Sequence, residues 1–178
     1  MVCTANLCRS PIAEQLLRRA VDDAGLAWSV SSAGTRARSG QPMHPRAAAE
    51  LQRRGVAPAD DWSSRRLTRE LLEQADLVLT AETEHRQYIV TKWPDQLRHT
   101  FLLRHFARLV TAVEAGNPLS TSDLVQRATA ALSHVQPATH GEDELADPIR
   151  GRGRAFRACA QTVEDAVNRV VARISRPS

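Results

Sequence analysis

The sequence has 178 residues, of which 42% are hydrophobic and 25% are charged, and its net charge is +4. This balance predicts one compact domain over residues 1–178, and no apolar run is long enough for a membrane span or a secretory signal peptide, so we expect a cytoplasmic protein. Arginines are spread along the chain and only 4% of residues are aromatic, which argues against nucleic-acid binding.

Helix and strand signals alternate along the chain. Ser10 as N-cap, followed by Pro11, begins a first amphipathic helix that ends at Gly25. Alternation of this kind predicts an α/β fold in which an open parallel sheet carries helices on both faces and binds its ligand at the carboxyl ends of the strands. Further helices are expected at 45–55, 67–75, 82–93, 104–116, 120–135 and along an apolar stripe from Phe156 to Ile174, and strands at 27–35, 76–80 and 99–103.

Three cysteines, Cys3, Cys8 and Cys159, do not make a disulfide framework in a chain of this length. They contain no C-x-x-C pair and no histidine lies near the first two, so we expect no metal site. Cys159 falls on the apolar stripe of the last helix, where a buried packing thiol is expected. The histidines, among them His85, are expected to be surface or core residues.

The stretch CTANLCRS, residues 3–10, lies where the first strand of such a sheet turns into the first helix. Unpaired amides and the helix dipole favour an anion at this point, and a thiol placed there has its pKa lowered. Arg9 follows Cys3 by six positions, so a curled loop brings the planar guanidinium over the same oxygens that the amides contact. The spacing C-x5-R predicts a phosphate cradle with its own nucleophile.

The stretch VCTANLCRSPIAE resembles the phosphate loop of the low molecular weight protein tyrosine phosphatase family, which reads V-C-x-G-N-x-C-R-S-P-x-A-E. The similarity continues in SAGT at 32–35, HPRAAAELQRRG at 44–55, ADLVLTAETEH at 75–85 and ADPIRG at 146–151. The resemblance implies a three-layer αβα fold with a central four-stranded parallel sheet. It also implies hydrolysis of phosphomonoesters, most specifically of phosphotyrosine in proteins, without metal or other cofactor.

The resemblance also assigns roles to residues. Cys3 is expected to attack phosphorus and form a phosphocysteine, Arg9 to bind the phosphoryl oxygens, and Asp147 to act as general acid and then general base. Cys8 matches a loop cysteine that forms a reversible disulfide with the nucleophile in relatives. The other positions carried over are the substrate-binding loop residues Thr4, Ala5, Asn6, Leu7, Cys8 and Ser10, and the supporting Ser32.

The sequence departs from the family pattern at four places. Ala5 replaces a loop glycine and is expected to be strained if that position needs a positive φ. Ile149 follows Asp147-Pro148 where an aromatic wall is common, and Trp62 stands where a supporting histidine is common. Only two residues precede Cys3, so we expect the first strand to be largely missing and an apolar segment to precede Met1 in the full protein; a chain that begins at Met1 is expected to be unstable, with a mobile Cys3.

Two alternatives stay open at this point. The first is an arsenate reductase of the same fold, which relays a disulfide through further cysteines on a mobile segment. The cysteines needed for this relay are incomplete here, because Cys159 is expected inside a packed helix. The second is a catalytically impaired module that binds phosphate or phosphoproteins. The expected partners are therefore a phosphorylated protein or a small phosphomonoester, with no nucleic acid and no membrane span.

Overall fold

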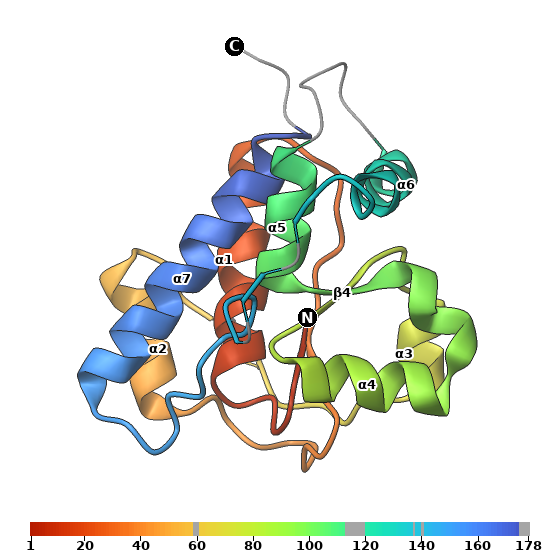
Figure 1. Cartoon of the computed structure of the whole chain (residues 1–178). Coiled ribbons are helices and arrows are strands. Elements are labelled where there is room, and N and C mark those ends of the chain that lie inside the picture. The colour runs from red at the N-terminus through yellow and green to blue at the C-terminus, as the bar shows by residue number, and fades with distance from the viewer. Residues whose placement is uncertain (59–60, 113–119, 137, 140, 175–178) are drawn as a thin grey trace.

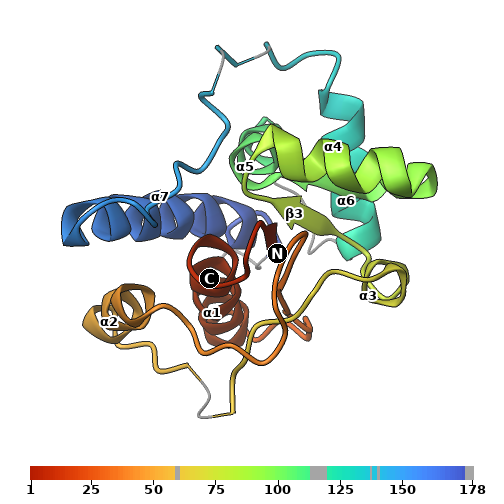
Figure 2. The same cartoon turned by 90° about the horizontal axis from the view of Figure 1, so that it is seen from below.

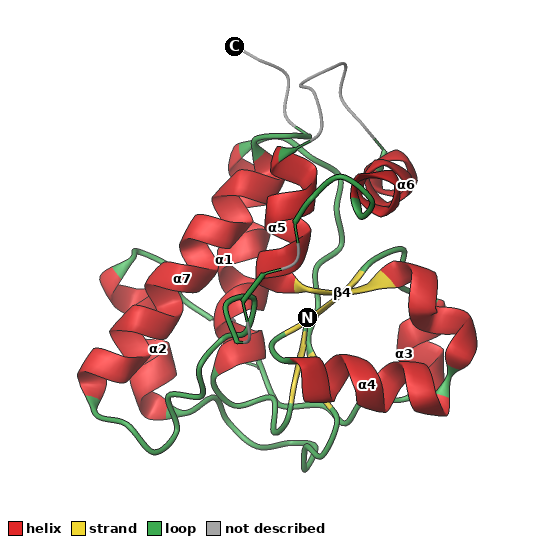
Figure 3. Cartoon of the chain, in the orientation of Figure 1, coloured by secondary structure: helices red, strands yellow, loops and turns green. Residues whose placement is uncertain are grey.

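The computed structural model describes residues 1–58, 61–112, 120–136, 138–139 and 141–174. Its strands are short and most of the chain between the helices is loop (Figure 3). In chain order the elements are β1 (Val2–Cys3), α1 (Arg9–Asp23), β2 (Ala33–Gly34), α2 (Pro45–Arg53), α3 (Arg69–Glu73), β3 (Val78–Thr80), α4 (Thr83–Lys92), a 3-10 turn (Pro94–His99), β4 (Thr100–Leu102), α5 (Leu103–Thr111), α6 (Thr121–Ala131) and α7 (Gly153–Val171).

The four strands form one parallel sheet in the order β2-β1-β3-β4, and helices cover both of its faces (Figure 2). On one face α1, α2, α5 and α7 pack together around a core that contains Ile12, Phe106 and Phe156. On the other face α3 and α4 enclose a smaller core with Val78 and Ile89. The expected α/β architecture of three layers with a central four-stranded parallel sheet is confirmed.

β1 has only two residues, but it occupies a central position and pairs with strands on both sides. Val2 and Cys3 lie opposite Ala33 and Gly34 of β2, and Val2 also lies opposite Thr80 of β3. The backbone carbonyls of β1 accept from both neighbours, since Thr35 N donates to Cys3 O at 2.9 Å and Ala81 N donates to Val2 O at 2.9 Å. Because β1 is paired on both sides, the backbone that leads into Cys3 is tied to the sheet.

Most predicted elements lie where the sequence places them, with two exceptions. The predicted strand at 27–35 is reduced to Ala33–Gly34, because the backbone before residue 33 has no strand beside it. The prediction of Ser10 as N-cap is wrong: α1 begins at Arg9 with Cys8 as N-cap and without a side-chain cap. The predicted end of the fifth helix at Gly116 lies outside the described residues.

A cavity of about 400 Å³ opens beside β1, between residues 27–33 and 74–79. Its lining includes Met1 and Val2 but none of residues 3–10, so it is separate from the loop that carries the candidate nucleophile. In the part of the chain that the structure describes, no helix has the length and apolar character needed to cross a bilayer.

Candidate active site

The loop of residues 4–8 joins the carboxyl end of β1 to the N-terminus of α1 (Figure 1). Among the described residues, the backbone amides of residues 5–8 donate to no acceptor. Free amides at a helix N-terminus bind anions, because the helix dipole adds to their positive partial charge. The loop therefore has the chemistry of an oxyanion site, and Cys3 is positioned at its entrance.

The thiol of Cys3 is 3% exposed, and its Sγ lies 3.0 Å from Oγ of Ser10. The same hydroxyl accepts a hydrogen bond from Nδ2 of Asn6 over 2.9 Å, so its own proton can be directed at the sulfur. Ser10, in the first turn of α1, is thus in the right place to support a nucleophile rather than to cap the helix.

The sharp bend of the loop falls on Asn6 and not on Ala5. Asn6 has a φ of 56° and is the described non-glycine residue with a positive φ, so position 5 does not meet the condition under which Ala5 was expected to be strained. Asparagine tolerates the left-handed region better than most residues. Its side chain also fixes the bend, since Nδ2 donates to Ser32 Oγ at 2.7 Å and Oδ1 accepts from Arg65 N at 2.8 Å.

A buried carboxylate on α1 supports this bend from behind. Glu14 is 3% exposed and accepts from Ser32 Oγ at 2.5 Å and from Trp62 Nε1 at 3.0 Å. Ser32 in turn accepts from Asn6, so a chain of hydrogen bonds runs from Trp62 to the loop. Trp62 therefore takes part in the support of the loop, as a neutral donor. Sequence reasoning missed Glu14, although it ends the quoted stretch PIAE.

Gly34 of β2 lies directly against the loop. A Cβ added there would lie 2.5 Å from Thr4 O and 2.8 Å from Asn6 N, both backbone atoms. No ordinary side chain fits at such distances. The glycine of the SAGT stretch therefore allows the loop to approach the sheet edge closely.

The guanidinium of Arg9 is 3% exposed and turns toward the carboxyl end of β3. Its Nη1 lies 2.6 Å from Oε2 of Glu82 and donates to Leu145 O at 3.1 Å, while Nη2 lies 3.1 Å from Oδ2 of Asp147. Burial disfavours the charged guanidinium, but the hydrogen bond and charge of Glu82 and the charge of Asp147 outweigh it, so the pKa of Arg9 is raised. Arg9 stays a cation beside Cys3.

Asp147 reaches this position from a segment far along the chain. Leu145 N donates to Ala81 O at 2.8 Å, which ties the segment to the end of β3, and the Asp147 side chain stays 42% exposed. Its other oxygen, Oδ1, accepts from Ile149 N at 3.2 Å. The structure thus brings Asp147 to the arginine that follows the loop, as the resemblance implies, and leaves it open to solvent and substrate.

Thr4, the first loop residue, is held by a histidine that sequence reasoning dismissed. His85 is 1% exposed, and its Nε2 lies 2.8 Å from Thr4 Oγ1. Its Nδ1 accepts from Glu82 N at 3.1 Å, so the neutral ring donates from Nε2 to Thr4. Burial first, and Arg9 second, lower the pKa of His85 to about 4. The sequence feature that could have identified Glu82 and His85 as site residues is their position just after the carboxyl end of β3, where parallel sheets bind ligands.

The remaining cysteines differ from Cys3 in their surroundings. Burial, reinforced by the charges of Cys3 and Asp147, raises the pKa of Cys8 to about 12, and burial raises that of Cys159 to about 12. Both stay thiols at neutral pH, and thiols are poor nucleophiles. Cys159 lies in the main core on α7, as predicted, and Cys8 is a buried free thiol at the N-terminus of α1.

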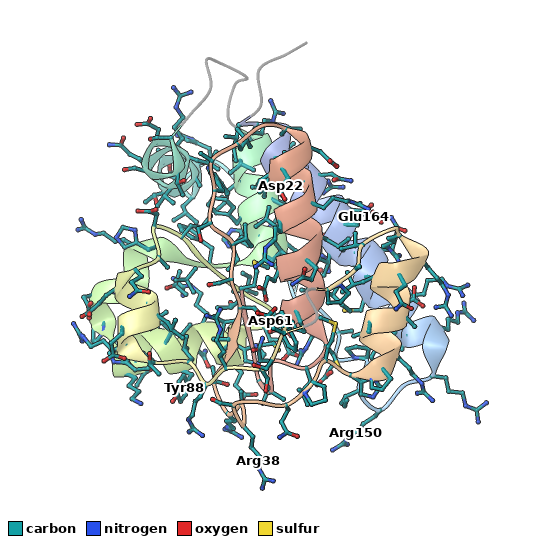
Figure 4. All side chains as sticks on the ribbon, turned by 180° about the vertical axis from the view of Figure 1, so that it is seen from behind. Asp22, Arg38, Asp61, Tyr88, Arg150 and Glu164 are labelled. Atoms are coloured by element: carbon teal, nitrogen blue, oxygen red, sulfur yellow. The ribbon has the colours of Figure 1, made fainter. Side chains whose placement is uncertain are left out.

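The mouth of the loop has an exposed rim. Ala5 is exposed, Leu7 packs partly against the main core, and Ile149 has 44% of its surface exposed. Figure 4 shows Arg38 and Arg150 at the end of the molecule opposite Asp22, which lies near the C-terminus of α1. The N-terminus of α1 is at that same end, so the candidate oxyanion site and these two basic side chains share one end of the molecule.

Comparisons with known proteins agree with this geometry. The family model for low molecular weight phosphotyrosine protein phosphatase matches residues 1–132. A protein-arginine-phosphatase from Bacillus subtilis is 36% identical over 105 residues, which cover 59% of this chain and 69% of the relative. A low molecular weight protein-tyrosine-phosphatase from Streptomyces coelicolor is 29% identical over 177 residues, which cover 97% of this chain and 90% of the relative.

Among solved structures, the YwlE arginine phosphatase from Geobacillus stearothermophilus superposes with a TM-score of 0.70 at 26% identity, covering 96% of this chain and 88% of that one. The family match includes Cys3 and Arg9 but ends before Asp147, which contacts Arg9 in the structure. The loop, the arginine and the matched residues lead to one conclusion: the chain belongs to the low molecular weight phosphotyrosine protein phosphatase family.

Proposed function

We propose that this phosphatase hydrolyses phosphotyrosine in proteins through a phosphocysteine on Cys3, with Arg9 as the phosphate clamp and Asp147 as the general acid and base. The observation that carries the proposal is the contact of Arg9 with Asp147, 138 positions away, beside a buried Cys3 at the mouth of a loop with free amides. Nucleophile, cation and proton donor thereby meet at one place.

The first step transfers the phosphoryl group to the enzyme. The Cys3 thiolate attacks phosphorus, the ester P–O bond breaks, and protonated Asp147 gives its proton to the leaving oxygen. The loop amides and Arg9 stabilise the charge on the three equatorial oxygens. Asn6 and Ser10 hold the loop and the sulfur in place, and Ser32 holds Asn6.

The second step releases inorganic phosphate. The Asp147 carboxylate takes a proton from water, the water oxygen attacks phosphorus, and the P–S bond breaks to return the Cys3 thiolate. Asp147 is again protonated and ready for the next ester. Besides the substrate and one water molecule, the proposed cycle uses only side chains and amides of the protein.

A second candidate substrate is phosphoarginine in proteins. The Bacillus subtilis relative is named a protein-arginine-phosphatase, and Ile149, rather than an aromatic residue, follows Asp147-Pro148 here. A site without an aromatic wall lacks one source of preference for a flat phenyl ring. The same nucleophile and acid would cleave a P–N bond, with the proton going to the leaving guanidine nitrogen.

The test uses the purified protein on three substrates: 4-nitrophenyl phosphate and two peptides of one sequence that carry either phosphotyrosine or phosphoarginine. We expect turnover of the aryl phosphate and its loss in Cys3→Ser. For the phosphotyrosine peptide, whose leaving group is more basic, we expect a kcat/KM loss of about 100-fold or more in Asp147→Asn. Acid quenching and mass spectrometry should find phosphate on Cys3. A higher kcat/KM for the phosphoarginine peptide would replace the tyrosine proposal with the second candidate.

The two alternatives predict other results. An arsenate reductase needs further reactive cysteines near Cys3, whereas Cys159 is a core thiol with a raised pKa; arsenate reduction coupled to thioredoxin would favour it. A binding module would bind inorganic phosphate tightly without turnover of any of the three substrates. That second outcome would refute the proposed hydrolysis.

A further inference from the structure

The residues that lead to Asp147 contain no helix or strand to hold them. Residues 141–147, here called the acid segment, run as turns and irregular backbone and contact Arg104 and Arg108 of α5. A general acid must be placed within hydrogen-bond reach of the leaving atom, and misplacement by about 1 Å can cost about 100-fold in rate. The acid segment therefore needs anchors outside its own backbone.

Arg108 of α5 supplies the first anchor. Its Nε and Nη2 donate to Oδ1 and Oδ2 of Asp143, each over 2.9 Å, and its Nη1 donates to Gln136 O at 3.2 Å. The pair is partly buried, with 27% of the Arg108 side chain and 13% of the Asp143 side chain exposed. A two-bond arginine-carboxylate pair in such surroundings fixes direction as well as distance.

Arg104, one turn earlier on the same helix, supplies the second anchor. Its Nη1 donates to Glu144 O at 3.1 Å. The next residue, Leu145, is 2% exposed and is bonded through its N–H to Ala81 O. Three consecutive residues, 143 to 145, are thus each fixed, and Asp147 follows two positions later.

These anchors become important when substrate binds. In the structure Arg9 contacts both Leu145 O and the Asp147 carboxylate, and a phosphoryl group competes for that guanidinium. Once Arg9 turns to phosphate, Asp147 loses a partner that now holds it. The anchors on α5 do not depend on Arg9.

We propose that Arg108 and Asp143 are positioning residues for Asp147, which hold the acid segment while Arg9 binds phosphate. The proposal rests on the proposed role of Asp147 as general acid. A cavity of about 340 Å³ lined by Arg108, Asp143 and polar residues of α7 borders the pair. Water can therefore solvate Asp143 when Arg108 is replaced, so we expect the variants to fold.

The test measures kcat/KM for two aryl phosphates, 4-nitrophenyl phosphate and phenyl phosphate. The phenolate that leaves from phenyl phosphate is the more basic of the two leaving groups. Arg108→Gln and Asp143→Asn should each lose about tenfold or more toward phenyl phosphate and less than about threefold toward 4-nitrophenyl phosphate, because only the basic leaving group depends strongly on the acid. Arg108→Lys should lose an intermediate amount of kcat/KM toward phenyl phosphate. The double variant of Arg108 and Asp143 should lose no more kcat/KM than either single variant.

Arg69→Gln is the matched control, since it removes an exposed ion pair with Glu73 on α3, remote from the acid segment; it should leave both values unchanged. Hydrogen exchange of the Leu145 amide should be faster in Arg108→Gln than in Arg69→Gln. Equal losses on the two substrates, or no loss, would overturn the positioning role. If Asp147→Asn leaves the ratio of the two substrates unchanged, the proposed acid itself fails, and the positioning role fails with it.

Discussion

Arg9 Nη2 lies 3.1 Å from Asp147 Oδ2, and the two residues are 138 positions apart in the chain. Nη1 of the same guanidinium lies 2.6 Å from Glu82 Oε2. Under the proposed role of Arg9, a phosphoryl group bound at Nη2 would displace Asp147 and leave Glu82 in place. Glu82 therefore orients Arg9 with or without substrate, whereas Asp147 is the partner that substrate replaces.

This division predicts the effect of Glu82→Ala. The variant leaves a guanidinium that is 3% exposed without its nearest counter-charge, and the free energy of unfolding should fall by about 3 kcal/mol. Glu82→Gln keeps a hydrogen-bond acceptor for Arg9, so its free energy of unfolding should fall by less than that of Glu82→Ala. Urea unfolding measures both. Inorganic phosphate should stabilise Glu82→Ala more than the wild type, because it supplies the missing negative charge; equal stabilisation would contradict the orienting role.

Gly34→Ala tests the close contact between β2 and the loop. The added Cβ would meet the Thr4 and Asn6 backbone at 2.5 and 2.8 Å, so the loop must move. We expect kcat/KM for 4-nitrophenyl phosphate to fall by about 100-fold or more. Gly153→Ala is the control, because a Cβ there meets nothing within 4 Å. Full activity in Gly34→Ala would show that the loop tolerates displacement.

Glu14→Gln tests the support behind the loop. Oε2 of Glu14 accepts from both Ser32 Oγ and Trp62 Nε1, and Oε1 accepts from Arg18 Nη2 at 2.8 Å, so the NH2 group of a glutamine must face donors on one of the two sides. A buried mismatch of this kind costs about 2 kcal/mol of unfolding free energy, and Trp62→Phe should cost about 1 kcal/mol. Activity should fall about tenfold in Glu14→Gln, since a neutral amide holds Ser32, and through it Asn6, less firmly than the carboxylate does. Glu73→Gln on exposed α3 is the control, and an equal activity loss there would contradict the link.

The local pattern of the sequence predicts the elements that define the loop. Residues 76–80 were expected as a strand and contain β3, and Ser10-Pro11 marks the start of α1 to within two residues. Both follow from burial and from backbone preferences, which act over a few positions. The resemblance adds Asp147, whose local surroundings are those of any acidic loop.

The contacts that complete the site depend on residues far apart in the chain. His85 lies 81 positions from Thr4, and Trp62 lies 48 from Glu14, so no local pattern links either pair. The positive φ falls on Asn6 and not on Ala5, and the hydrogen bonds that fix it come from Ser32 and Arg65, 26 and 59 positions away. Side-chain networks of this kind become visible only when the sheet and helices are assembled.

His85 makes stability depend on pH in a predictable direction. Burial lowers its pKa from 6.5 to about 4 in the folded protein, so between these values the unfolded chain binds a proton that the folded chain does not. Stability is therefore fully present above about pH 6.5 and is lost as the pH falls toward 4. Protonation of Nδ1 would also break the bond from Glu82 N.

The predicted loss from this one group between pH 7 and pH 4 is up to about 3 kcal/mol of unfolding free energy. His85→Asn cannot titrate in this range. Its unfolding free energy, measured with urea, should therefore drop between pH 7 and pH 4 by up to about 3 kcal/mol less than that of the wild type. His134→Asn is the matched control, because His134 is exposed and far along the chain from Thr4, and it should keep the wild-type difference. The same difference in His85→Asn as in the wild type would mean that the carboxylates alone cause the acid sensitivity. A reduced difference, with kcat/KM lowered through loss of the bond to Thr4, would assign His85 to both stability and loop geometry.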